Sequence, residues 1–194
     1  MNVSAIVMAS GMSRRMNNDK LLMKIKSRQI FEYILETIIK CDFYDKTVVA
    51  KDGEILQKSN SLGFNAVKNT EYENGQSWSI ILGIEKSKKT DGYMFFVADQ
   101  PLVSVETVNF MLESFEKNPY CIIVPRCGDK TRNPVIFPYV LKDELLMLSG
   151  DNGGKAVISK NKDKIVFVDI DREHEFMDID TMEDYENVNK KVER

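Results

Sequence analysis

Short apolar runs alternate along this chain with longer amphipathic segments, and this alternation limits the possible folds more than any other feature. It is typical of strand–helix–strand units, in which a helix connects two parallel strands of one sheet. Four of the runs are almost continuous in Val, Ile, Phe or Ala, as expected for strands buried on both faces. The sequence therefore predicts an α/β fold with a mostly parallel sheet. The predicted strands are 3–9, 47–50, 65–67, 93–98, 121–124, 135–137 and 165–168.

The segments between these runs carry helical patterns. An apolar stripe with spacings of three and four residues runs through 30–39. Residues 76–89 end in lysines, which the helix dipole favours at a C-terminal end. Residues 104–116 form another predicted helix with Ser104 as its N-cap, and a last helix begins at Thr181, which is predicted to cap it.

Length and charge restrict the classes of protein that need to be considered. With 194 residues the chain suits a single domain spanning 1–194. A net charge of −3 gives no overall attraction to nucleic acid or to anionic lipid, so any anion site must be local. The three cysteines have no paired spacing and indicate reduced thiols, and the longest apolar run is far too short to cross a bilayer. We expect a cytoplasmic protein with no nucleic-acid or membrane partner.

Small residues and cations follow the first predicted strand. Residues 9–11 are Ala, Ser and Gly, which let a ligand approach backbone amides at the end of the strand. Arg14 and Lys20 add a planar guanidinium and a point charge, both suited to phosphate oxygens. The segment is not the G-x-x-x-x-G-K-[ST] phosphate loop, so an ordinary solvated basic loop is the alternative.

Acidic residues follow the most apolar strand and precede the last helix. Asp99 leaves a buried strand beside a proline, and a carboxylate held in that way suits Mg²⁺. The alternative is that Asp99 caps the next turn. Asp178 and Asp180 lie in a segment predicted to be extended, and we expect only one of them to face a given site. The alternative for this pair is surface acidity.

Two loops contain glycine at predicted helix starts. Residues 74–79 could contact a base or ribose through Gln76, Ser77 and backbone amides. Residues 149–156 place the adjacent Gly153 and Gly154, an aspartate and a lysine where a helix N-terminus can hold an anion. A plain turn with an N-cap is the alternative for both loops.

Six segments together match an ordered set of motifs. They are MASGMSRRMNNDK at 8–20, GQSWS at 75–79, ADQP at 98–101, RNP at 132–134, GDNGGK at 150–155 and DIDTMED at 178–184. In this order they resemble the molybdenum cofactor cytidylyltransferases, within the molybdopterin nucleotidyltransferase family. The resemblance covers nearly the whole chain. It implies a three-layer αβα Rossmann-like nucleotide-transferase fold with a mostly parallel sheet.

The resemblance also implies a reaction and a set of site residues. The terminal phosphate of the molybdenum cofactor would attack the α-phosphate of CTP, giving the cytosine dinucleotide cofactor and pyrophosphate. The implied catalytic residues are Arg14, Lys20 and Asp99, and the implied Mg²⁺ ligands are Asp99 and Asp180. The implied nucleotide-binding residues are Ala9, Ser10, Gly11, Ser13, Arg14, Lys20, Gly75, Gln76, Ser77, Ser79, Ala98 and Asp99. The implied acceptor-binding residues are Gln100, Asn133, Pro134, Asp151, Gly153, Gly154 and Lys155.

The preferred base is inferred from Ser10. The guanylyl branch has glycine there, and a Cβ should crowd a purine more than a pyrimidine; Gln100 also matches the cytidylyl pattern, so we expect CTP. Four positions depart from the pattern: Asn17 and Arg132 each replace a glycine, Lys155 replaces an arginine, and Met182 replaces a proline.

Two kinds of alternative stay open. One is an enzyme that uses GTP, or that acts on another phosphorylated acceptor such as a sugar phosphate. The other is a non-catalytic chaperone that delivers cofactor to a molybdenum hydroxylase. Delivery to an apo-hydroxylase, as a transient partner, could also be a second role of the transferase.

Overall fold

The computed structural model describes residues 1–11 and 19–192. All seven predicted strands are present, with ends shifted by at most three residues, and a short further strand adds to them. The strands of the main sheet are β1 (Val3–Ala9), β4 (Asp45–Ala50), β5 (Asn65–Lys68), β6 (Gly92–Val97), β7 (Ile122–Cys127), β8 (Lys130–Thr131), β9 (Val135–Pro138) and β10 (Ile165–Asp169). A separate two-stranded hairpin consists of β2 (Lys24–Ile25) and β3 (Arg28–Gln29).

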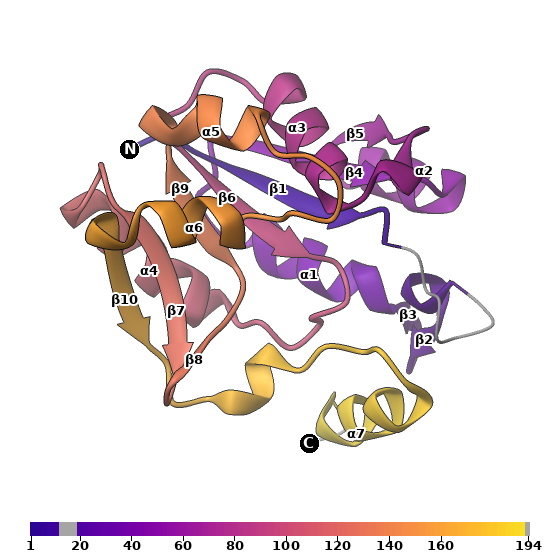
Figure 1. Cartoon of the computed structure of the whole chain (residues 1–194). Coiled ribbons are helices and arrows are strands. Elements are labelled where there is room, and N and C mark those ends of the chain that lie inside the picture. Colours follow the sequence, from indigo (N-terminus) through magenta and orange to yellow (C-terminus); the bar gives the residue numbers. More distant parts are fainter. Residues whose placement is uncertain (12–18, 193–194) are drawn as a thin grey trace.

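The main sheet is mostly parallel, as predicted. Its order is β10-β7-β9-β6-β1-β4-β5, with β8 paired to β7 (Figure 1). β1 lies between β6 and β4 and is parallel to both, whereas β9 is antiparallel to β6 and β7. In this register Met8 pairs with Val97 and Ala9 pairs with Ala50. The three central strands therefore end together, and the loops that follow them meet at one edge of the sheet.

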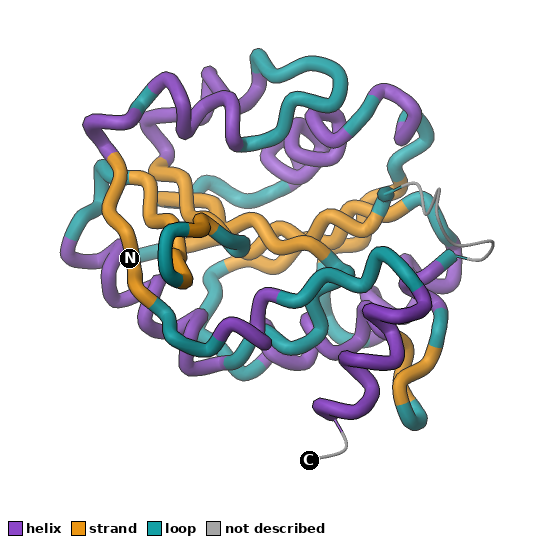
Figure 2. Tube along the Cα trace, turned by 60° about the horizontal axis from the view of Figure 1, so that its bottom comes forward, coloured by secondary structure: helices purple, strands orange, loops and turns teal. Residues whose placement is uncertain are grey.

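Helices cover both faces of the sheet, which confirms the three-layer αβα fold (Figure 2). One apolar core packs between the sheet and α1, α2, α4 and α7, and the other between the sheet and α3, α5 and α6. The helices are α1 (Ile30–Ile39), α2 (Gly53–Ser61), α3 (Gln76–Lys86), α4 (Val105–Lys117), α5 (Lys142–Leu146), α6 (Lys155–Lys160) and α7 (Met182–Val192). Short 3-10 turns are η1 (Lys20–Leu22), η2 (Tyr72–Asn74), η3 (Tyr139–Leu141), η4 (Lys162–Lys164) and η5 (Glu173–Phe176). Within the described ranges, no helix combines the length and the apolar character that crossing a membrane requires.

The predicted helix caps are confirmed. The Ser104 hydroxyl accepts a hydrogen bond of 3.1 Å from the Thr107 amide at the start of α4. At the start of α7, Thr181 Oγ1 accepts from the Asp184 amide at 3.2 Å, and the Asp184 carboxylate accepts from the Thr181 amide at 2.8 Å. This reciprocal pair satisfies donors that a helix N-terminus leaves unpaired. It also fixes the position of the acidic segment that precedes α7.

Helix α3 lies very close to the central strand at Gly83. A Cβ at this position would overlap Cγ2 of Ile6, a fully buried residue of β1. Replacing Gly83 with alanine should therefore destabilise the protein by about 1–2 kcal/mol, because overpacking outweighs the better helix propensity of alanine. Urea unfolding measures this change. As a control, Gly53→Ala at the start of α2 meets no atom within 4 Å and should be neutral or slightly stabilising. Equal stability of the two variants would contradict the close packing.

Candidate functional site

The loops after β1 and β6 bring small residues and one carboxylate to the same edge of the sheet. Ser10 is buried, and its Oγ donates a hydrogen bond of 3.1 Å to the carbonyl oxygen of Val49 in β4. This bond holds the Ser10 hydroxyl against β4, while the backbone at the end of β1 sets the place of its Cβ in the wall. Ala98 is buried beside it, and Asp99 follows with its side chain 22% exposed. Together these residues form the floor of a site at the carboxyl ends of the central strands.

Lys20 joins two carboxylates that are far apart in the sequence. Its Nζ lies 2.7 Å from Oδ2 of Asp99 and 2.8 Å from Oδ1 of Asp180. Lys20 is held there because it opens η1, where the Asp19 carboxylate accepts a capping hydrogen bond from the Leu21 amide. Burial acts to lower the pKa of Lys20, but the charges and hydrogen bonds of Asp99 and Asp180 outweigh it and raise the pKa. Lys20 therefore stays a cation at neutral pH.

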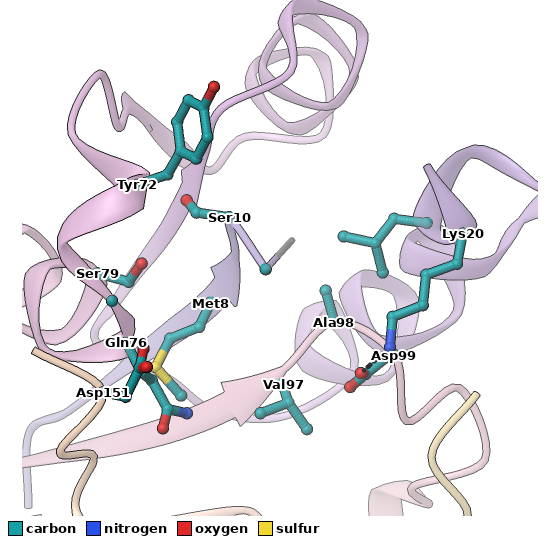
Figure 3. Close-up of a pocket in the computed structure, with 13 residues that line it drawn as sticks. Met8, Ser10, Lys20, Tyr72, Gln76, Ser79, Val97, Ala98, Asp99 and Asp151 are labelled. Carbon is teal, nitrogen blue, oxygen red and sulfur yellow. Dashed lines mark hydrogen bonds and ion pairs between the residues drawn. The ribbon is translucent and has the colours of Figure 1, made fainter. Parts of the chain in front are cut away.

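A first cavity of about 260 Å³ opens above this floor (Figure 3). Most of the residues predicted to bind a nucleotide line it together, although they come from three separate motifs. They are Ser10, Gly11, Lys20, Gly75, Gln76, Ser79, Ala98 and Asp99.

Two other predicted nucleotide-binding residues, Ala9 and Ser77, are described but do not line this cavity. Ala9 is buried inside the sheet at the end of β1, and it does not line the first cavity. The side chain of Ser77 is also buried, and its amide donates to the carbonyl oxygen of Gly150 at 3.2 Å. Ser13 and Arg14 lie outside the described residues. The predicted roles of these four residues stay predictions.

Several residues that line the first cavity were not predicted to bind the nucleotide. Met8, Leu21, Tyr72, Val97 and Asp151 also line it. Figure 3 shows the Tyr72 ring beyond Ser10, on the far side of the cavity from Lys20 and Asp99. Met8 and Asp151 belong to matched motifs. The others reach the cavity through long-range packing, which no local pattern signals.

Gly75 holds two loops together at the entrance to α3. Its φ of 87° is in the region that favours glycine, and a Cβ there would overlap the carbonyl oxygen of Gly150 and the carboxylate of Asp151. The loop 149–156 therefore packs directly on the start of α3. Through this contact Gln76 and Asp151 become part of two neighbouring cavities.

The second cavity has a volume of about 620 Å³ and lies beside the first. It has an apolar wall of sheet residues, Phe95, Val124, Val135 and Phe137, and a polar rim. Arg132 belongs to this rim, although its motif gave only a weak signal. The residues predicted to bind an acceptor that line the cavity are Gln100, Asn133, Asp151, Gly153, Gly154 and Lys155. Pro134, which follows a cis peptide bond, is buried and does not line it.

Asp178 and Asp180 both face the site, so the prediction that only one of them would do so is wrong. They flank the fully buried Ile179, and residues two apart in an extended segment lie on the same side. The Ile179 amide donates to the carbonyl oxygen of Asp99 at 3.1 Å, which anchors the segment. Asp178 accepts a hydrogen bond of 2.8 Å from Nε2 of Gln100. Desolvation first, and then the charge of Asp99, raise the pKa of Asp178.

Asp99 and Asp180 fit the ligand chemistry of Mg²⁺. Their oxygens lie within 2.7 and 2.8 Å of one cationic nitrogen, so both can reach a common cation. Across residues 1–11 and 19–192, no group of three or more His, Cys, Asp or Glu side chains is arranged to hold a metal ion. Mg²⁺ does not need such a group, because it is usually bound by one or two carboxylates together with waters and substrate phosphates.

Comparison with known proteins places the chain in a family. The family model described as "MobA-like NTP transferase domain" matches residues 5–165. This range contains the residues that line the two cavities, except Asp178 in the segment before α7. The chain belongs to this family. A probable molybdenum cofactor guanylyltransferase from Natranaerobius thermophilus is 29% identical over 64% of this chain and 60% of its own length. One from Aquifex aeolicus is 33% identical over 57% and 53%. The matches thus span little more than half the length of these relatives.

Solved structures of the family's fold agree with this chain over its whole length. A nucleotidyl transferase from Methanothermobacter has a TM-score of 0.82 at 19% identity, covering 100% of this chain and 98% of that one. CMP:2-keto-3-deoxy-manno-octonic acid synthetase in complex with CTP also has a TM-score of 0.82, at 12% identity, with coverages of 100% and 99%. At these identities the likeness shows the fold alone.

Loss of the Lys20 cation should make the stability of the protein depend on a divalent metal. Lys20→Ala leaves the carboxylates of Asp99 and Asp180 facing each other, which should cost on the order of 1–2 kcal/mol in the presence of a chelator. Added Mg²⁺ should restore most of this loss, because carboxylate oxygens are its preferred ligands. Urea unfolding with chelator and with Mg²⁺ measures both effects.

The matched control for this experiment is Lys24→Ala, which removes an exposed lysine of β2. Its free energy of unfolding should equal that of the wild type both with chelator and with Mg²⁺. If Mg²⁺ stabilises Lys20→Ala no more than it stabilises the wild type, the two carboxylates do not form a metal site.

Proposed function

We propose that this chain transfers a nucleotidyl group from a nucleoside triphosphate to the terminal phosphate of a molybdopterin-type cofactor, and that the donor is CTP. The proposal rests on one observation. Asp99 lines the first cavity and the next residue, Gln100, lines the second, so two ligands would meet at the end of β6. We assign the donor triphosphate to the first cavity and the acceptor to the second. The names of the relatives support a molybdenum cofactor as the acceptor.

The reaction is a substitution at phosphorus. An oxygen of the acceptor phosphate forms a bond to the α-phosphorus, and the bond from that phosphorus to the bridging oxygen of pyrophosphate breaks. The attacking phosphate is already ionised near neutral pH, so the site needs little general-base chemistry. Positioning and stabilisation of charge are its main contributions.

Lys20 is the described residue best placed to stabilise charge on the phosphates. It lines the first cavity, and its partners Asp99 and Asp180 keep it protonated. A cation preorganised in this way costs little reorganisation when negative charge develops on the leaving pyrophosphate. Arg14 is proposed to help from the loop that follows Gly11, which lies outside the described residues.

Asp99 and Asp180 are proposed to hold Mg²⁺. The ion would supply electrostatic neutralisation of the phosphates and a template that orients them. Asp178 would act indirectly: its hydrogen bond to Gln100 orients that amide at the boundary between the cavities.

The choice of CTP rests on Ser10. The backbone at the end of β1 sets the position of the Ser10 Cβ in the wall of the first cavity, whichever way the hydroxyl turns. This favours a pyrimidine over a larger purine. GTP is the second candidate donor, because the relatives described above are named guanylyltransferases. A panel of nucleotides assayed with purified molybdenum cofactor and Mg²⁺ decides between them, with pyrophosphate release as the measurement.

The same assay addresses the remaining alternatives. A non-catalytic carrier for a molybdenum hydroxylase would release no pyrophosphate, and the clustering of Lys20, Asp99 and Asp180 argues against it, since a carrier needs no such cluster. An enzyme for another phosphorylated acceptor would be active with a sugar phosphate and inactive with the molybdenum cofactor. Delivery of the product to a hydroxylase is compatible with the proposal.

Asp99→Asn should lower kcat of the transfer reaction by at least a hundredfold. The substitution keeps the size of the side chain but removes the charge that holds both Lys20 and the proposed Mg²⁺. Steady-state pyrophosphate release measures the effect, and circular dichroism checks the fold. Asp163→Asn, an exposed position in η4, is the matched control and should retain full activity. Near-wild-type turnover by Asp99→Asn would refute the metal assignment.

Ser10→Gly should shift the donor preference towards GTP. Removing the Cβ gives a purine more room, and one carbon in a pocket changes discrimination by roughly tenfold. The measurement is the ratio of kcat/KM for GTP to that for CTP. Ser10→Ala loses the hydrogen bond to Val49 but keeps the Cβ, so it should leave the ratio unchanged. A ratio that moves equally in both variants would assign the effect to the hydrogen bond.

A further inference from the structure

Arg132 stands at the mouth of the second cavity. It follows β8, and its amide donates to the carbonyl oxygen of Pro125 at 2.8 Å, which fixes the backbone beside β7. Its side chain lines the second cavity and also the adjoining depression that contains Asp178 and Asp180. Glycine occupies this position in the motif pattern that the chain resembles, so the cation distinguishes this chain from that pattern.

The guanidinium of Arg132 has a buried donor with no acceptor. Within the described part of the chain, three buried side-chain polar atoms have no hydrogen-bond partner, and Arg132 Nε is one of them. The other two, on Ser4 and Thr47, are hydroxyls inside the sheet on β1 and β4. A buried donor without a partner is unfavourable, more so on a charged group. Because Nε is closed to solvent, the guanidinium has to turn towards the cavity before a ligand can supply the acceptor that removes this cost.

The ion pair that Arg132 does make is weak. Its Nη2 lies 3.6 Å from Oε1 of Glu173, and the Glu173 side chain is 74% exposed. Solvent screens such a pair, and its contribution to stability is small. The pair therefore keeps the guanidinium near the cavity but leaves Nε unsatisfied.

We propose that Arg132 binds the anionic phosphate monoester of the acceptor. Nε and one terminal nitrogen of a guanidinium match two phosphate oxygens in a bidentate arrangement. Glu173 occupies one terminal nitrogen when no acceptor is bound, and the phosphate displaces it. Lys155 lies on the same cavity and supplies a second positive charge. This inference rests on the proposed function and extends it by naming a specificity-determining residue for the acceptor.

Arg132→Gln should raise KM for the acceptor by roughly tenfold or more, because charge-assisted hydrogen bonds are lost. KM for the nucleotide should be unchanged, since Arg132 does not line the first cavity. Arg132→Lys keeps the charge without the bidentate fork, so its KM for the acceptor should lie between those of the wild type and Arg132→Gln. The matched control is Arg126→Gln: this arginine of β7 is paired with Asp169 at 2.7 and 3.0 Å, does not line the second cavity, and should leave acceptor KM unchanged.

Glu173→Gln separates ligand binding from a structural role. If Glu173 competes with the acceptor, its removal should lower acceptor KM about two- to fivefold. If the pair only supports the fold, Arg132→Gln and Glu173→Gln should change KM in the same direction. An unchanged acceptor KM in Arg132→Gln, or a raised KM in Glu173→Gln, overturns the proposal. Circular dichroism of each variant identifies any loss of fold, and Glu173→Gln keeps the test decisive if Arg132→Gln does not fold.

Failure of the proposed function gives a different result. The wild type would then transfer no nucleotide to the molybdenum cofactor. In that case, inorganic phosphate is the probe, and ³¹P line broadening compares its affinity for wild type and Arg132→Gln. Phosphate bound near Lys20 should broaden the ³¹P signal equally in both proteins, so it does not affect the difference between them. A weaker affinity in Arg132→Gln supports an anion site at Arg132, and equal affinities exclude it.

Discussion

The contact of Lys20 with two carboxylates determines the geometry of the whole site. It joins the segment after β1, the end of β6 and the segment before α7, positions separated by 79 and 160 residues in the sequence. Without this cation, two carboxylates would face each other in a partly buried place, at a cost in free energy. With it, the C-terminal segment is drawn against the sheet edge, and Asp178 comes within reach of Gln100. Lys20 and Asp99 line the first cavity, and Gln100 and Asp178 line the second, so this arrangement contributes to the walls of both.

The strands were predictable because the apolar residues that show their burial are consecutive in the sequence. A run such as 93–98 is apolar at nearly every position, which is stable only between two layers of helices. The caps at Ser104 and Thr181 were predictable because the relevant hydrogen bonds join residues three apart. Helix α2 was missed because it is mostly polar and has one fully buried apolar residue, Ile55. The reversed direction of β9 was not predicted either, since it depends on how distant strands assemble.

The site was predictable as far as its motifs extend. Residues such as Ser10, Gln76 and Asp99 do converge on one cavity, because parallel strands end at a common edge. Tyr72 and Arg132 could not be placed from sequence, because their positions depend on packing between separate segments. The position of Asp178 could have been predicted. Side chains two apart in an extended segment share a side, and the buried Ile179 between them confirms which side that is.

Gly75 has a consequence for how two bound molecules would lie relative to each other. Any side chain at this position would push Gly150 and Asp151 away from the start of α3. Gln76 and Asp151, which line both cavities, would then move apart, and the shared wall between them would open. In the proposed reaction, the absence of a side chain at Gly75 would therefore set the separation between donor and acceptor, whereas the motif residues around it would set what each ligand can be.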